Sequence, residues 1–164
     1  MSRAVLSLGS NLGDRLGYLR LAVRGLSEVL VATSSVYETA PWGVTDQPDF
    51  LNAVVLVDSV EFGEWDWLRR AQQLEQRAER VRRQRWGPRT LDVDVVTVDD
   101  VRSDHPELLL PHPGTPQRAT VLVPWAEMDG AAVLPGHGAV FALCRELPPE
   151  EVAGVRKRSD LTLY

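Results

Sequence analysis

The order of extended and helical segments is the feature that most constrains how this chain can fold. Runs rich in β-branched and apolar residues at 4–8, 31–38, 51–58 and 91–98 predict four strands. Apolar residues at helical spacing fill the first and third intervals between these strands. The second interval, residues 39–49, contains proline and glycine and is predicted to be a loop. The segments therefore follow one another as β-α-β-β-α-β.

Two amphipathic helices are expected in this order. Asp14 stands where a carboxylate complements the N-terminus of the first helix. The apolar stripe of that helix consists of Leu16, Leu19, Val23, Leu26 and Leu30. The second helix is predicted over residues 62 to about 83, and its apolar stripe consists of Leu68, Ala71, Leu74, Ala78 and Val81.

This order is that of the ferredoxin-like split βαβ unit. We therefore expect an α+β fold with an antiparallel sheet that is covered by helices on one face. After residue 99 the chain is rich in proline and glycine, with short helices expected at 116–128 and 139–147. A length of 164 residues and a mass of 18.2 kDa suit a single domain, residues 1–164. No internal repeat, low-complexity tract or linker divides it.

Composition narrows the function classes. The net charge of -5 argues against broad nucleic-acid binding. No apolar stretch approaches the length of a membrane span, and the N-terminus lacks the pattern of a signal peptide, so a cytoplasmic protein is expected. Cys144 is the only cysteine, which excludes an intrachain disulfide and a cysteine-based zinc site.

Two carboxylates lie two residues apart in the fourth predicted strand. Because side chains alternate along a strand, Asp92 and Asp94 project to one face, while Leu91, Val93 and Val95 project to the other. Hard cations such as Mg²⁺ are held by one or two carboxylates together with phosphate oxygens. The pair therefore indicates a metal–polyphosphate centre. A solvent-facing strand edge is the alternative that this spacing leaves open.

Arginines just before this strand favour the phosphate interpretation. Arg85 and Arg89 flank a turn at Gly87-Pro88, so their positions do not follow from a helical surface. Guanidinium groups bind phosphate through paired hydrogen bonds.

The segment Gly9-Ser10-Asn11-Leu12-Gly13-Asp14 joins a strand to a helix, as phosphate-binding loops do. It has neither of the glycine patterns typical of such loops, and Lys157 is the only lysine in the chain. We therefore interpret the segment as a tight connection with a helix cap. ATP, if it binds, must be held by other residues.

The stretch from Arg85 to Val96 resembles the signature of the 6-hydroxymethyl-7,8-dihydropterin pyrophosphokinase family. The resemblance continues at residues 9–11, 47–52 and 111–113 and so covers most of the chain. Members of this family transfer pyrophosphate from ATP to the hydroxymethyl group of the pterin in folate biosynthesis. The resemblance implies a ferredoxin-like core and an ATP-dependent diphosphotransferase.

The resemblance also implies which residues bind ATP. The expected ATP-binding residues are Gln72, Glu75, Arg80, Trp86, Arg89, His112 and Arg118. The expected catalytic residues are Arg80, Arg89, Asp92 and Asp94, of which the two aspartates are the metal ligands. From spacing alone, Gln72 and Glu75 equally suit a solvated helix face, and His112, between Pro111 and Pro113, suits a surface loop.

A pterin requires an apolar wall for its ring and amide-type groups for its donor–acceptor edge. The resemblance places the pterin against Thr39, Pro41, Trp42, Phe50 and Asn52. Sequence alone favours a core position for Phe50. Thr120 and Pro113 stand where some family members carry aromatic residues, so one wall of the pterin site differs here.

The implied mechanism is direct transfer: the pterin hydroxymethyl oxygen attacks the β-phosphorus of ATP, and AMP leaves. Two Mg²⁺ ions are the expected cofactors. The loop from Arg82 to Trp86 is a hypothetical lid over ATP. The expected partners are ATP and 6-hydroxymethyl-7,8-dihydropterin, without nucleic acid or membrane, and the expected state is a monomer.

Two other functions remain open from the residues. A strand with two aspartates also serves other Mg²⁺-dependent nucleotidyltransferases and phosphoesterases. A ferredoxin-like sheet with arginines and exposed aromatic residues can also bind RNA, although an RNA-binding module has no use for an acidic pair.

Overall fold

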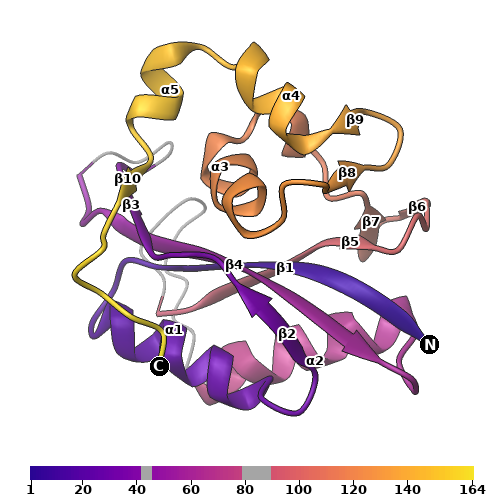
Figure 1. Ribbon diagram of the computed structural model, residues 1–164. Helices are drawn as coiled ribbons and strands as arrows, with labels where there is room; N and C mark the ends of the chain where they lie inside the picture. The colour runs from indigo at the N-terminus through magenta and orange to yellow at the C-terminus, as the bar shows by residue number, and fades with distance from the viewer. Residues whose placement is uncertain (42–45, 79–89) are drawn as a thin grey trace.

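A central antiparallel sheet organises the computed structural model, which describes residues 1–41, 46–78 and 90–164. Within these residues the main sheet has six strands in the order β10-β3-β4-β1-β5, and β2 also pairs with β4 (Figure 1). The strands are β1 (Ser2–Ser10), β2 (Leu30–Thr33), β3 (Tyr37–Thr39), β4 (Phe50–Ser59), β5 (Asp92–Val98) and β10 (Arg156–Lys157). β1 lies between β4 and β5, as the split βαβ order predicts. The α+β prediction is confirmed.

Helices cover both faces of the sheet, so the prediction of helices on one face was wrong. The helices α1 (Arg15–Gly25) and α2 (Glu64–Arg77) lie below the sheet in Figure 1. Above it lie α3 (Ala119–Met128), α4 (Val140–Glu146) and α5 (Pro149–Ala153). The second layer comes from the part of the chain after β5, which the β-α-β-β-α-β pattern does not include.

Alternation along the strands explains why two layers are needed. Leu6 and Val55 are buried in the cluster under α1 and α2, whereas Val5 and Val54, their chain neighbours, are buried in the cluster under α3 and α4. Apolar side chains on both faces of β1 and β4 would otherwise be exposed to water. Burial of both faces therefore requires the helices that follow residue 99.

Short elements connect the layers. The hairpin of β6 (Ser103–His105) and β7 (Leu108–Leu110) follows β5, and the 3₁₀ helix η1 (Thr115–Gln117) precedes α3. A second hairpin, β8 (Val133–Leu134) with β9 (Gly138–Ala139), lies between α3 and α4. No helix in the described ranges has both the length and the apolar character that crossing a bilayer requires.

The first helix begins as predicted and ends earlier. The Asp14 carboxylate accepts a hydrogen bond of 3.0 Å from the Gly17 N–H, which confirms the tight connection with a helix cap. The helix ends at Gly25, and Leu30 belongs to β2 rather than to the helical stripe. Local spacing alone does not distinguish the last apolar residue of the helix from the first of the strand.

The predicted strand 31–38 is divided into β2 and β3. From the pair Thr33↔Val55 to the pair Tyr37↔Asn52, the chain of β2 and β3 advances four residues while β4 advances three. One additional residue therefore lies between β2 and β3. Ser34 occupies the break: its N–H donates to the Val54 carbonyl at 2.8 Å, and its hydroxyl accepts from the Val54 N–H at 2.9 Å. A side-chain oxygen thus replaces a backbone acceptor, which keeps the ladder satisfied.

The second helix is anchored by a residue outside its predicted stripe. Trp67 is fully buried, and its indole N–H donates to the Ser2 hydroxyl at 2.8 Å. Ala71, Leu74 and Ala78 are buried as predicted. The end of the predicted helix, residues 79–83, lies outside the described residues.

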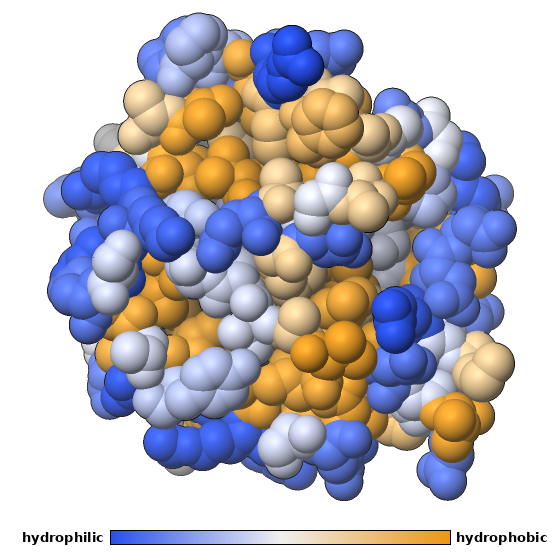
Figure 2. Space-filling view, viewed as in Figure 1, coloured by the Kyte–Doolittle hydropathy of each residue, from blue (hydrophilic) through white to orange (hydrophobic). Residues whose placement is uncertain are grey.

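The surface mixes apolar and charged side chains. Figure 2 shows apolar residues gathered near the middle of the viewed face with hydrophilic residues around them. The exposed large apolar residues include Val31 of β2 and Phe141 of α4. Single exposed apolar residues of this kind are ordinary for a folded domain.

Candidate active site

The strand register brings three chain-distant residues into one row across the sheet. Asn52 of β4 pairs with Gly9 of β1, and Gly9 pairs with Asp92 of β5. Val54 and Val96 lie on the same faces of β4 and β5 and are buried under α3, so the row faces the α3 side. Neighbouring strands are about 4.8 Å apart, which places the Cα atoms of Asn52 and Asp92 about 10 Å apart.

Asp92 and Asp94 project to this face together, as predicted. Leu91, Val93 and Val95 are buried in the opposite cluster, under α1 and α2. Both aspartates are half-buried, so their carboxylates lie at the boundary between protein and solvent. β5 is the last strand in the order of the sheet, so its position is also consistent with the alternative that the two aspartates simply face solvent at a sheet edge. Glu75 and His112 also lie at this strand, beside the two aspartates.

Glu75 of α2 reaches β5 between the two aspartates. Its Oε2 accepts a hydrogen bond of 2.9 Å from the backbone N–H of Val93. Glu75 is half-buried and fixes the backbone that carries Asp92 and Asp94. Gln72 lies one turn earlier on α2 and is exposed. Gln72 and Glu75, two of the predicted ATP-binding residues, therefore lie on the helix that packs along β5.

His112 lies beside the second aspartate. Its backbone N–H donates to the Val96 carbonyl at 2.8 Å, and its carbonyl accepts from the Thr115 hydroxyl at 2.6 Å. These bonds fix the loop so that the imidazole Nε2 lies 3.9 Å from Oδ1 of Asp94. That distance is too long for a direct hydrogen bond. It still brings the imidazole of His112 close to the carboxylate of Asp94.

Three of the predicted pterin residues, Thr39, Phe50 and Asn52, lie together at the other end of the row. The amide Nδ2 of Asn52 donates to the hydroxyl of Thr39 at 2.7 Å, which fixes the orientation of the amide. Phe50 is half-buried and belongs to neither buried cluster, so the core position favoured by sequence is wrong. A Cβ added at Gly9 would lie 3.4 Å from Oδ1 of Asn52 and 3.6 Å from Cδ1 of Phe50. Gly9 thus keeps the middle of the row open.

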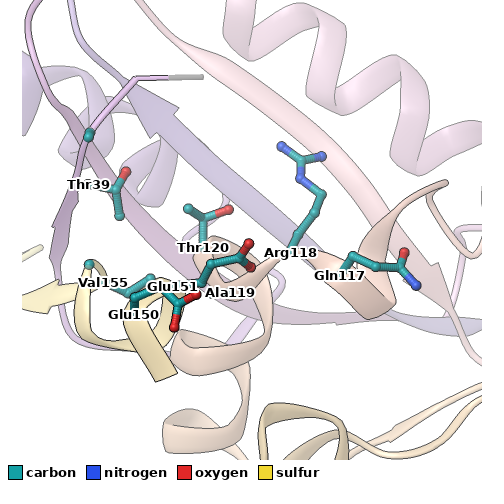
Figure 3. A pocket seen from close by; sticks show the side chains of 10 residues that line it. Thr39, Gln117, Arg118, Ala119, Thr120, Glu150, Glu151 and Val155 are labelled. Carbon is teal, nitrogen blue, oxygen red and sulfur yellow. The ribbon is translucent and has the colours of Figure 1, made fainter. Parts of the chain in front are cut away.

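A cavity of about 270 Å³ lies next to Thr39 on the same side of the sheet (Figure 3). In Figure 3 the Arg118 side chain extends away from the glutamates of α5. Thr120 of α3 lines this cavity opposite α5 and the residues that follow it. The cavity is lined by Thr39, Arg118, Thr120, Glu150, Glu151 and Val155, among others.

Several predicted site residues lie in or beside the two ranges 42–45 and 79–89, outside the described residues. Pro41 is described and half-buried, at the end of the segment that follows β3. The lid from Arg82 to Trp86 falls outside the described residues. So do the predicted site residues Trp42, Arg80, Trp86 and Arg89.

The chemistry of Asp92 and Asp94 can be compared with the ligands that a magnesium ion needs. In residues 1–41, 46–78 and 90–164, no group of three or more His, Cys, Asp or Glu side chains could hold a metal ion by itself. Asp92 and Asp94 supply hard oxygen ligands on one face of one strand. A magnesium ion typically binds to one or two such carboxylates and takes its remaining ligands from phosphate and water. The donor set therefore suits Mg²⁺ shared with a polyphosphate.

Sequence reasoning missed two contributors to the site. Gly9 was interpreted as part of a turn, although it lies within β1 and in the middle of the row. Val155 and the α5 glutamates line the cavity and were given no role. The resemblance at residues 9–11 was a signal for Gly9, whereas no local pattern indicates that α5 packs beside Thr39.

Comparisons with known proteins agree with this arrangement. A family profile described as 7,8-dihydro-6-hydroxymethylpterin-pyrophosphokinase (HPPK) matches residues 5–130. A Mycobacterium leprae protein described as 2-amino-4-hydroxy-6-hydroxymethyldihydropteridine pyrophosphokinase is 48% identical over 176 residues, covering 99% of this chain and 92% of its own. The protein of the same description from Mycobacterium tuberculosis H37Rv is 45% identical over 168 residues, covering 95% and 89%.

Solved structures share the fold. A crystal structure of wild-type Plasmodium falciparum HPPK-DHPS with pteroate superposes with a TM-score of 0.67 at 13% identity, over 88% of this chain and 44% of that chain. The chain thus spans under half the length of those Plasmodium chains. At this identity the likeness concerns the fold alone.

The sequence relatives establish more than the fold. The family profile covers well over half of the chain, and the mycobacterial relatives exceed 40% identity over nearly its whole length. The chain belongs to the 7,8-dihydro-6-hydroxymethylpterin-pyrophosphokinase family, the pyrophosphokinases of folate biosynthesis.

Proposed function

We propose that this pyrophosphokinase joins its two substrates over the row formed by Asn52, Gly9 and Asp92. It transfers the pyrophosphoryl group of ATP to the hydroxymethyl group of 6-hydroxymethyl-7,8-dihydropterin. This row is the main support for the proposal. It aligns the amide of Asn52 with the carboxylate of Asp92, a group that can bind a metal ion, and Gly9 places no side chain between them. A span of about 10 Å suits a flat bicyclic ring with a short reactive arm.

The pterin binds at the Asn52 end. An amide side chain has two N–H groups and an acceptor oxygen, and one N–H of Asn52 is used by Thr39. The remaining donor and acceptor suit the edge of a pterin, which carries both kinds of group. Phe50 supplies an apolar wall beside Gly9. Pro41 and Trp42 belong to the same proposed pocket, as the resemblance implies.

ATP binds at the Asp92 end. Asp92 and Asp94 would hold two Mg²⁺ ions, and His112, close to Asp94, is placed to bind a phosphate oxygen. When bound, magnesium supplies positive charge that offsets the charge developing on the phosphates. Glu75 keeps the strand beneath the two aspartates in place through the Val93 amide. Gln72, Arg80, Trp86, Arg89 and Arg118 complete the proposed ATP site.

The reaction is an in-line displacement at the β-phosphorus. The hydroxymethyl oxygen forms the new P–O bond and loses its proton to solvent, the bond to the α-phosphate oxygen breaks, and AMP leaves. The protein contributes mainly by holding the two substrates in this geometry. We further propose, as the sequence predicts, that the protein is a cytoplasmic monomer.

The nucleotide product tests this proposal. The protein is incubated with ATP, Mg²⁺ and 6-hydroxymethyl-7,8-dihydropterin, and the products are separated by chromatography. AMP and the pterin diphosphate in equal amounts are expected. Release of pyrophosphate or inorganic phosphate instead would indicate a nucleotidyltransferase or a phosphoesterase. The Asp94→Asn variant is the control for metal-dependent transfer.

A further inference from the structure

Three arginines from two distant parts of the chain converge on one glutamate behind the proposed pterin site. Glu38 of β3 accepts from Arg15 of α1 at 2.6 Å and from Arg158 at 2.9 Å, and Arg156 of β10 lies 3.9 Å away. The Glu38 side chain is only 14% exposed. Because the Glu38 carboxylate is largely buried and accepts from two guanidinium groups, removal of one of them would leave a poorly solvated charge with fewer partners. We call Arg15, Glu38, Arg156 and Arg158 the Glu38 cluster.

Two of these arginines also bind Asp49, the residue just before β4. Nη1 of Arg15 donates to the backbone carbonyl of Asp49 at 3.0 Å, and Nη2 of Arg156 binds the Asp49 carboxylate at 3.0 Å. Asp49 precedes Phe50, the first residue of β4. The Glu38 cluster therefore binds both β3 and the residue before β4. β3 contains Thr39, and β4 contains Phe50 and Asn52, which are proposed pterin residues.

The cluster lies on the face of β3 opposite the site. Side chains alternate along β3, so Glu38 faces α1 while Tyr37 and Thr39 face the α3 side. Thr39 pairs with Phe50, and its hydroxyl accepts from Asn52. A shift of Glu38 or Asp49 would move Thr39, Phe50 and Asn52 together.

The segment that carries two of these arginines also borders the cavity. Gly154 and Val155 line the cavity next to Thr39, and Arg156 and Lys157 then pair with β3 as β10. Figure 2 shows hydrophilic side chains gathered over β3 and β10, at the left of the view. This segment lies beyond residue 130, where the family match ends. The segment thus lies beside Thr39 and pairs with the strand that carries it.

We propose that the Glu38 cluster positions the pterin-binding residues, and that the C-terminal segment 154–158 is in this way part of the substrate site. Arg15, Glu38, Arg156 and Arg158 act through Thr39, Phe50 and Asn52 and touch no substrate. Loss of the cluster therefore weakens pterin binding while ATP, held at the other end of the row, binds as before. This inference rests on the function proposed above.

Steady-state kinetics with each substrate varied in turn test the inference. Arg158→Ala removes one cation, and Arg158→Lys keeps the charge. For Arg158→Ala we expect the KM for the pterin to rise about tenfold, with kcat and the KM for ATP within about twofold of wild type. Arg158→Lys should recover part of the loss. Arg3→Ala, which removes an exposed ion pair with Asp58 at the opposite end of β1 and β4, is the matched control and should change neither KM.

The cluster should also behave as one unit. Glu38→Gln should raise the KM for the pterin, and the double variant with Arg158→Ala should add little to either single change. If Glu38→Gln does not fold, Arg156→Ala serves instead, because that side chain is more than half exposed. Circular dichroism confirms that each variant is folded.

Two outcomes would overturn the inference. A folded Arg158→Ala protein with an unchanged KM for the pterin would show that the cluster does not position the site. An equal rise in both KM values would show a general loss of structure. Failure of the wild-type protein to form pterin diphosphate would instead contradict the proposed function.

Discussion

At the scale of single residues, the site depends on a position that lacks a side chain. Gly9 has Asn52 on one side and Asp92 on the other, so any group there would occupy the space proposed for the substrate. Its φ is not in the left-handed region, and a Cβ would meet its nearest neighbours at ordinary contact distance. The fold therefore does not require glycine at this position, whereas the proposed reaction does.

Gly9→Ala separates these two requirements. We expect the variant to fold with a stability equal to wild type or higher by up to about 1 kcal/mol, because glycine within a strand is entropically costly. The KM for the pterin should rise about tenfold. Thermal unfolding and kinetics measure the two effects. Gly130→Ala, where nothing lies within 4 Å of an added Cβ, is the control. An unchanged KM for the pterin would remove Gly9 from the site.

Asp94 provides a second prediction at this scale. Asp94→Ala should fold nearly as well as wild type, because it removes one of two neighbouring carboxylates that repel each other. Its rate of AMP formation should fall about 100-fold or more. Urea unfolding and a product assay at saturating ATP and Mg²⁺ measure these effects. A variant that retains substantial activity would show that Asp94 is not a metal ligand.

At the scale of elements, local periodicity predicted which segments form strands and helices but not where the ladder is interrupted. The alternation that places Asp92 and Asp94 on one face is local, and it was predicted correctly. The break at Ser34 depends on Val54, twenty residues away, and has no local signal. The second helical layer depends on contacts between the chain after residue 99 and the sheet, which a segment pattern does not contain.

Ser34→Ala tests the hydroxyl in this break. The Val54 N–H is buried and would lose its acceptor, so we expect the free energy of unfolding to fall by about 1–3 kcal/mol. Ser34→Thr keeps the hydroxyl and should lose less. Urea denaturation of the three proteins provides the comparison. Identical midpoints for Ser34→Ala and wild type would show that the serine side chain does not support the ladder.

At the scale of the whole molecule, long-range ion pairs link the two ends of the chain around the proposed substrate site. The resemblance implied roles for Asn52, Asp92 and His112 in advance. The strand register then showed that Asn52 and Asp92 lie on either side of Gly9, and the loop that follows β7 places His112 near Asp94. The Glu38 cluster was not foreseen, because residues 15, 38 and 158 share no local pattern. Ion pairs between distant segments appear only once the fold brings them together.

The pH dependence of stability reports on this linkage. Hydrogen bonds and charge from Arg15, followed by those from Arg158, hold the pKa of Glu38 below its ordinary value of 4.5. A carboxyl group with a lowered pKa in the folded state contributes stability above its unfolded pKa and loses it as the pH falls through the folded pKa. The stability difference between wild type and Glu38→Gln should thus be largest above pH 4.5 and shrink below it. Urea unfolding across this range measures the difference, and a constant difference would contradict the interpretation.

A structure with an ATP analogue, Mg²⁺ and the pterin tests the central claim most directly. The account predicts magnesium on the oxygens of Asp92 and Asp94, the pterin edge on Asn52 and the hydroxymethyl arm passing over Gly9 towards the β-phosphate. Carboxylates that turn away from every ion, or a pterin bound away from β1, would contradict it.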